Sequence, residues 1–263
     1  MHRNKAMEQN DTVGGRDSAW RGQLRGAMPA KERTAIPRVE MPQLDGAYRV
    51  TCNEEVNQGL RPEMAVTEAS RCLDCPNPTC VEGCPVGIDI PGFIKNIQRG
   101  NIAGAYSVLR RTSALPAVCG RVCPQERQCE SRCIYNKMKK APVAIGYLER
   151  FAADSAREAG VPAGDMPQSN GKKVAVVGSG PCALSFAGDM AARGFEVDVF
   201  EALHEIGGVL KYGIPEFRLP NSVVDAELDG LRAAGVRFHT DTVVGKTLSY
   251  ERLLEMGFDG LFV

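Results

Sequence analysis

Apolar and polar positions divide the chain into four segments. Residues 1–45 show no apolar period and carry several prolines and glycines, which predicts an extended N-terminal arm. Residues 46–158 show short apolar stripes at helical spacing and predict a small helical domain. A linker rich in glycine and proline is expected over 159–171, and residues 172–263 alternate strand-like and helix-like patterns. The expected fold class is therefore α followed by α/β.

The helical segment contains three clear helix patterns. The first follows Asp89, a residue type that often caps helix N-termini. The second is expected over 103–111, and the third is expected to be opened by Pro142. Apolar positions on one face are expected to form core: Ile90, Phe93, Ile94 and Ile97 in the first helix, and Ala144, Tyr147, Leu148 and Phe151 in the third.

The α/β segment opens with a strand–turn–helix–strand pattern. Residues 174–177 form an apolar run typical of a buried strand. A helix pattern runs over 184–193, and a second strand is expected over 196–200. This is the context in which a glycine-rich turn indicates dinucleotide binding.

The turn after the first strand has the composition of a dinucleotide fingerprint. Gly178 permits the tight turn, Gly180 lets the backbone approach a pyrophosphate, and Ala183 lets the helix pack closely on the strand. The helix N-terminus offers its N–H groups to phosphates, and Glu201 after the second strand can bind the ribose hydroxyls. A glycine-rich turn in a sheet that binds nothing is the alternative. Glu201 disfavours a 2′-phosphate, which leaves FAD or NAD(H).

Eight of the ten cysteines form two sets with similar spacing. They are Cys72, Cys75, Cys80 and Cys84 in the first set, and Cys119, Cys123, Cys129 and Cys133 in the second. Thiolates in this number are typical ligands of iron–sulfur clusters or zinc. In two-cluster ferredoxins, a cysteine followed by proline binds the other cluster, and Cys84 precedes Pro85. The pattern therefore predicts two [4Fe–4S] clusters that share ligands between the sets, with electron transfer as the function.

Three other interpretations of the cysteines remain open. Disulfides are one, but residues 1–30 lack the apolar core of a signal peptide, and without secretion such a pattern more often binds metal. Zinc is the second, although only Cys72 and Cys75 have the Cys-x2-Cys spacing of a zinc ribbon. Ordinary core packing is expected for Cys52 and Cys182, which stand alone in the sequence.

Composition indicates which partners are not expected. The 32 Lys and Arg residues balance 32 Asp and Glu residues, so no general basic field attracts nucleic acid. The longest apolar runs are far too short to span a bilayer. We therefore expect a cytoplasmic protein without a nucleic-acid or membrane partner. The three histidines are scattered, and no catalytic triad or carboxylate pair is visible.

Together with a glycine-punctuated loop over 207–220, the cysteine sets and the fingerprint resemble the small subunit of NADPH-dependent glutamate synthase. They are also similar to the N-terminal module of dihydropyrimidine dehydrogenase and to the large subunit of NADH-dependent ferredoxin:NADP oxidoreductase. The resemblance covers about residues 30–263. It implies a helical domain with two [4Fe–4S] clusters, followed by the first part of a Rossmann-like FAD-binding domain. Since the chain stops at Val263 inside an expected strand, we expect a truncated FAD domain, an NADPH site outside this chain, and no activity of the chain alone.

The resemblance also implies cofactor ligands by position. One cluster would be held by Cys72, Cys75, Cys80 and Cys133. The other would be held by Cys84, Cys123, Cys129 and Glu149, at a position where relatives carry Gln or Glu. An exposed helix acid is the alternative for Glu149, and Cys119 is left as a packing residue. The residues implied near FAD are Gly178, Gly180, Glu201, Gly207 and Gly208.

The implied function is electron transfer from NADPH through FAD and the two clusters to a partner. The protein would bind and tune the cofactors, which carry the chemistry. In glutamate synthase the partner is the large subunit, the reaction converts glutamine and 2-oxoglutarate to glutamate, and an oligomer is expected. The alternatives are an oxidoreductase linked to ferredoxin or sulfur species and a non-catalytic iron–sulfur adaptor, of which the fingerprint disfavours the adaptor.

Overall fold

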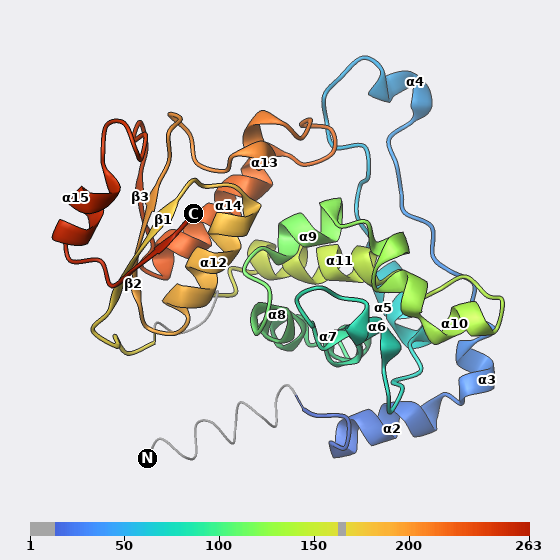
Figure 1. Ribbon diagram of the computed structural model, residues 1–263. Coiled ribbons are helices and arrows are strands. Elements are labelled where there is room, and N and C mark those ends of the chain that lie inside the picture. The colour runs from blue at the N-terminus through green and yellow to red at the C-terminus, as the bar shows by residue number, and fades with distance from the viewer. Residues whose placement is uncertain (1–13, 163–166) are drawn as a thin grey trace. The chain divides into compact units, whose positions relative to one another are not determined.

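The computed structural model describes residues 14–162 and 167–263 (Figure 1). Within these ranges the chain forms two compact units. Of the described residues, the first draws on 14–46 and 57–161, and the second on 47–56, 162 and 167–263. Each unit has its own buried core. No helix in the described ranges is long and apolar enough to cross a membrane.

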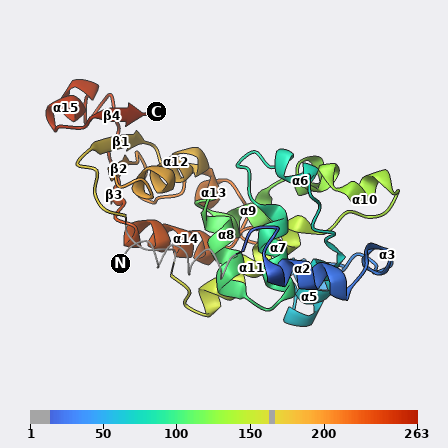
Figure 2. The ribbon, with the colours of Figure 1, turned by 90° about the horizontal axis from the view of Figure 1, so that it is seen from below.

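The first unit is built from short helices. Helix α11 packs against α5, α7, α8 and α9, and α7 also packs against α5 and α8 (Figures 1 and 2). The bounds are α2 Ala19–Ala27, α3 Ala30–Arg33, α5 Pro62–Arg71, α6 Thr79–Glu82, α7 Ile90–Gln98, α8 Ile102–Arg110, α9 Pro116–Val122, α10 Ile134–Lys137 and α11 Ile145–Glu158, with 3₁₀ turns at Gln125–Arg127 and Glu130–Arg132.

Side-chain caps and apolar stripes explain why these helices form. Asp89 accepts a hydrogen bond from the backbone N–H of Gly92 at 3.0 Å, which confirms it as the N-cap of α7. Asn101 caps α8 in the same way through the N–H of Gly104 at 2.9 Å. The predicted core positions of α7 are fully buried, and those of α11 are buried except for the partly exposed Tyr147.

Helix α11 starts at Ile145, three residues later than predicted. The carbonyl of Pro142 accepts hydrogen bonds from Arg38 and Arg71, and the N–H of Ala144 donates to Glu68. These bonds hold the segment before α11 in a non-helical conformation, which a local sequence pattern cannot show.

The described part of the N-terminal arm differs from the expected extended segment, because it contains helices α2 and α3. The only buried side chain of α2 is Arg21, and the only buried side chain of α3 is Arg33. Helices that bury arginines leave no apolar period, so the sequence pattern missed them. Residues 1–13 of the predicted arm lie outside the described residues.

The second unit is a parallel sheet with helical connections, as the strand and helix patterns predict. The sheet has four strands in the order β3-β2-β1-β4, all parallel. Its register pairs Val174 with Val197 and Val176 with Val199. The bounds are α4 Gly46–Arg49, β1 Lys173–Val177, α12 Pro181–Ala191, β2 Glu196–Phe200, α13 Val209–Tyr212, α14 Asn221–Ala233, β3 Arg237–His239, α15 Tyr250–Glu255 and β4 Gly260–Phe262.

The strand order places a topological switch at β1. The chain runs from β1 outward to β2 and β3, and then returns to pair β4 on the other side of β1. In open parallel sheets, ligands bind beyond the carboxyl ends of the strands at such a switch. The glycine-rich turn after Val177 occupies this place.

Candidate functional site

Four cysteines of the first unit line one pocket. Cys72 ends α5, Cys75 lies in the loop that follows, Cys80 lies in α6, and Cys133 separates a 3₁₀ turn from α10. The pocket therefore joins three cysteines of the first sequence set to the last cysteine of the second. The remaining lining is mostly apolar and includes Ile90, Ile94, Tyr135, Val143 and Ile145.

The four thiols influence one another electrostatically. Burial raises the pKa of the Cys80 thiol, and charge on the neighbouring thiols raises it further. The contributing neighbours are Cys72, Cys133 and Cys75. Burial also raises the pKa of the Cys75 and Cys133 thiols. Because metal binding requires thiolates, a bound metal group would supply the positive charge that makes their ionisation favourable here.

A second group contains three of the other predicted ligands, Cys84, Cys129 and Glu149. Burial raises the pKa of Cys129 to about 12, with further contributions from Glu130, Glu149 and Cys84. Cys123 ends helix α9, which packs against α11, the helix of Glu149. Glu149 is only 5 % exposed, so its alternative reading as an exposed helix acid is wrong.

The donor arrangement bears on the choice of metal. Within residues 14–162 and 167–263, no three His, Cys, Asp or Glu side chains are arranged to hold a single metal ion. The four thiols instead surround a shared pocket, and a [4Fe–4S] cluster takes one thiolate from each of four cysteines. The residues present therefore fit a cluster. All ten cysteines are free thiols, which contradicts the disulfide alternative.

The cysteines without an expected cofactor role have different surroundings. Cys119 lies in α9, where Ser113 Oγ donates to its Sγ at 3.9 Å. Cys52 is partly exposed. Cys182 is exposed in the first turn of α12, so the expectation of a core cysteine is wrong there, because this helix position does not face the sheet.

The second unit carries the glycine-rich turn. Gly178 follows β1 with φ +85°, a left-handed conformation that favours glycine. Gly180 is the N-cap of α12 and has an ordinary φ of −69°. A Cβ at Gly180 would touch no atom of the protein, so neither packing nor backbone conformation demands glycine there. A glycine at this position would let a ligand approach the backbone closely. Ala183 is buried in the first turn of α12.

The Gly207–Gly208 turn lies against the fingerprint. Both residues have positive φ, +130° and +52°. A Cβ at Gly208 would lie 2.9 Å from the Cα of Gly180, so a side chain there would displace the fingerprint turn. The structure thus brings together three of the glycines expected near a dinucleotide: Gly180, Gly207 and Gly208.

Glu201 connects these segments from the end of β2. Its carboxylate accepts hydrogen bonds from the N–H of Ser179 at 2.8 Å, from the hydroxyl of Ser179, and from the N–H of Leu203 at 2.9 Å. The hydroxyl oxygen of Ser179 in turn accepts from the N–H of Gly207 at 3.0 Å. Glu201 therefore holds the glycine-rich turn in place through Ser179.

Sequence reasoning missed three buried polar residues of these sites: Ser179, Asp74 and Lys95. Ser179 could have been noticed between two fingerprint glycines. Lys95 lies within the apolar stripe of α7, and a lysine at a core position is an available signal. Burial lowers the pKa of Lys95 to about 8. For Asp74, nothing in the local sequence indicates burial.

Comparisons with known proteins agree with this division. Residues 49–161 match the family described as dihydropyrimidine dehydrogenase domain II, 4Fe-4S cluster. Residues 176–232 match the family described as an NAD(P)-binding Rossmann-like domain. The first match covers both cysteine sets, and the second covers the fingerprint.

Full-length relatives extend the comparison. The NAD-dependent dihydropyrimidine dehydrogenase subunit PreT of Escherichia coli O157:H7 is 38% identical over 76% of this chain and 48% of its own length. The glutamate synthase [NADPH] small chain of Halomonas elongata is 38% identical over 80% of this chain and 44% of its own. The corresponding small chain of Escherichia coli K12 is 36% identical over 87% and 48%. The chain thus spans less than half the length of these relatives.

Proposed function

Because the chain belongs to the oxidoreductase family that includes the glutamate synthase small chains and the PreT subunits, we propose that it is an electron-transfer module. In this proposal the helical unit holds two [4Fe–4S] clusters and the α/β unit binds FAD. The single observation that supports it most strongly is the pocket shared by Cys72, Cys75, Cys80 and Cys133.

The proposed ligands follow the two groups of side chains. Cys72, Cys75, Cys80 and Cys133 would hold the first cluster. The second cluster would be held by Cys84, Cys123, Cys129 and Glu149. The buried position of Glu149 and its electrostatic effect on Cys129 support the fourth of these ligands.

The proposed FAD site uses the turn at the end of β1. Gly178 would permit the tight turn, since its own N–H donates to the carbonyl of Phe200 at 2.8 Å. Gly180 would let the backbone approach the pyrophosphate, and Gly207 and Gly208 would close the turn from the other side. Glu201 would keep the turn in place through Ser179. When bound, FAD would take an electron pair as hydride from a nicotinamide, and the clusters would pass electrons one at a time. The nicotinamide would be NADPH, bound outside this chain.

The proposed acceptor is a glutamate synthase large subunit, which uses the electrons to make glutamate from glutamine and 2-oxoglutarate. A second acceptor is supported by a specific observation, since a PreT subunit is as similar to this chain, at 38% identity, as a glutamate synthase small chain is. In that case the partner would be a pyrimidine-reducing subunit. Both proposals share the two clusters and FAD. They differ in the docked partner and in the nicotinamide, because the PreT subunit is described as NAD-dependent and the glutamate synthase small chain as NADPH-dependent.

The test begins with the intact protein purified without oxygen. Denaturation should release FAD, identified by chromatography, and stoichiometric dithionite should bleach the flavin absorbance and produce cluster EPR signals. The reduced protein is next mixed with a purified glutamate synthase large subunit or with a pyrimidine-reducing subunit. The partner that reoxidises the clusters in the presence of its substrate identifies the acceptor. Protein that contains neither flavin nor iron would refute the proposed function.

A further inference from the structure

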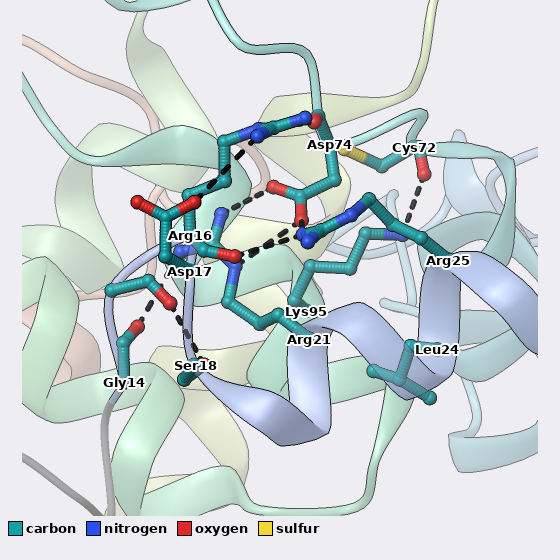
Figure 3. A network of polar contacts seen from close by, with 12 residues as sticks. Gly14, Arg16, Asp17, Ser18, Arg21, Leu24, Arg25, Cys72, Asp74 and Lys95 are labelled. Atoms are coloured by element: carbon teal, nitrogen blue, oxygen red, sulfur yellow. Dashed lines mark hydrogen bonds and ion pairs between the residues drawn. The ribbon is translucent and has the colours of Figure 1, made fainter.

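The loop between Cys72 and Cys75 lies within a network of buried charges (Figure 3). Asp74, between the two cysteines, is fully buried and has a left-handed φ of +54°. Its carboxylate accepts hydrogen bonds from Arg21 and, at 2.6 Å, from Arg25, both on helix α2. Helix α2 therefore fixes a loop that carries two of the proposed cluster ligands.

Lys95 contacts the same loop from helix α7. Its Nζ donates to the carbonyl oxygen of Cys72 at 2.5 Å and to Oε1 of Gln98 at 2.7 Å. The side chain of Lys95 is fully buried. Figure 3 shows it beside the Asp74 network, directed at the backbone of Cys72.

A further cation shares the acceptor of Lys95. Arg33 of α3 is 2 % exposed and donates to the carbonyl oxygen of Ser70 at 2.5 Å and to Oε1 of Gln98 at 3.3 Å. One amide oxygen thus accepts from two buried cations, and no charge on Gln98 compensates them.

Positive charge exceeds negative charge in this network. Within the described residues that form it, the fully buried cations are Arg21, Arg33 and Lys95, and the fully buried carboxylate is Asp74. Buried charge is unfavourable unless an opposite charge compensates it. A cluster and the thiolates that hold it carry negative charge. A cluster in the pocket of Cys72 would therefore compensate the surplus positive charge.

The same surplus has a consequence for redox chemistry. Reduction adds one negative charge to a cluster, and buried positive charge stabilises the reduced form more than the oxidised form. Net charge around a cluster is one of the main determinants of its reduction potential. The arrangement therefore favours reduction at the Cys72 pocket.

We propose that Lys95 and Arg33, joined through Gln98, raise the reduction potential of the cluster held by Cys72, Cys75, Cys80 and Cys133. They act as positioning and charge-tuning residues and do not bind iron. This inference rests on the proposed cluster site.

The most direct variant is Gln98→Glu. It keeps an oxygen that accepts from both Lys95 and Arg33 and adds one negative charge to the network. Lys95→Met removes one positive charge at similar length. The matched control is Lys31→Met on helix α3, where the lysine is exposed and its charge is screened by solvent.

The measurement is an anaerobic redox titration of the intact protein, followed by EPR at neutral pH and accompanied by iron analysis. We expect Gln98→Glu and Lys95→Met to move one cluster potential to more negative values. The other cluster potential and both potentials of Lys31→Met should stay close to those of the unchanged protein. Gln98→Glu protein with full iron content and two unchanged potentials would overturn the inference while leaving the proposed cluster site intact. If the protein without substitutions contains no iron, both the proposed function and this inference are refuted.

Discussion

At the scale of single residues, the ligand sets proposed for the two clusters cross between the two cysteine sets. Cys133 closes the second set in the sequence, yet it lines a pocket with Cys72, Cys75 and Cys80. Regular spacing alone would assign each set to its own cluster. The proline after Cys84 and the family resemblance led to the interleaved assignment instead.

Replacing Cys133 tests this assignment. Cys133→Ala should remove the cluster of the first set and reduce the iron content from about eight to about four per chain. Cys119→Ser is the matched control, since Cys119 contacts Ser113 and lies outside the pocket of Cys133. Iron analysis and EPR of the reduced variants provide the readout. Loss of a cluster in the Cys119 variant would contradict the assignment.

Glu149 supplies a second test. Glu149→Ala should leave one iron without a protein ligand and make its cluster labile to oxygen. Glu149→Gln keeps an oxygen donor but removes a negative charge, so its cluster should persist with a more positive potential. Iron content and potentiometry distinguish the two variants. Unchanged iron content, EPR signal and potential in Glu149→Ala would exclude Glu149 as a ligand.

Site residues that follow a local sequence pattern could be predicted from the sequence. Buried polar residues whose partners lie on other helices could not. The cysteines, the fingerprint glycines and Glu201 have characteristic spacings that indicate their roles from the sequence alone. Lys95 and Asp74 acquire importance from partners on other helices. Asp74 depends on Arg21 and Arg25, about fifty residues earlier in the chain, which no local window includes.

At the scale of elements, the same distinction explains which helices and strands were predicted. The stripe of α7 and the strands β1 and β2 bury apolar side chains, so their periods are visible in the sequence. Helices α2 and α3 are held by buried arginines and were expected as an extended arm. The late start of α11 depends on hydrogen bonds between Pro142 and distant arginines.

Strand β2 provides a prediction about stability. Asp198 is buried on β2, which opposes its ionisation, but hydrogen bonds from Arg237 and His239 on β3 outweigh burial and lower its pKa. Asp198→Asn should therefore cost about 1 kcal/mol of unfolding free energy at neutral pH, a value that allows for solvent screening at Arg237. Chemical denaturation followed by circular dichroism would measure it.

The sign of the pH dependence follows from the lowered pKa of Asp198. The stabilisation is complete above the unfolded value, roughly 4, and is lost as the pH falls through the folded pKa. The difference between the unchanged protein and Asp198→Asn should thus shrink on acidification. Asp229→Asn, which removes an exposed pair with Arg232, should have little effect at any pH. An equal loss in both variants would contradict this account.

At the scale of the whole molecule, the two units have separate cores and separate proposed cofactors. This separation predicts that damage to one site leaves the other loaded. Glu201→Ala should release the turn held through Ser179 and weaken FAD binding about tenfold or more, which corresponds to the loss of one buried charged hydrogen bond. Both cluster EPR signals should be unchanged.

The control for that variant is Glu255→Ala, because Glu255 is exposed and forms an ion pair with Arg252 within helix α15. Its FAD affinity should stay near that of the unchanged protein. Loss of cluster signals in Glu201→Ala would show that the two sites are not independent.

The account as a whole depends on two [4Fe–4S] clusters in the helical unit. Iron and acid-labile sulfide, measured together on anaerobically purified protein, test this most directly. The expected result is about eight irons and about eight sulfides per chain, with a brown visible spectrum. A colourless protein with stoichiometric zinc and no sulfide would contradict the central claim.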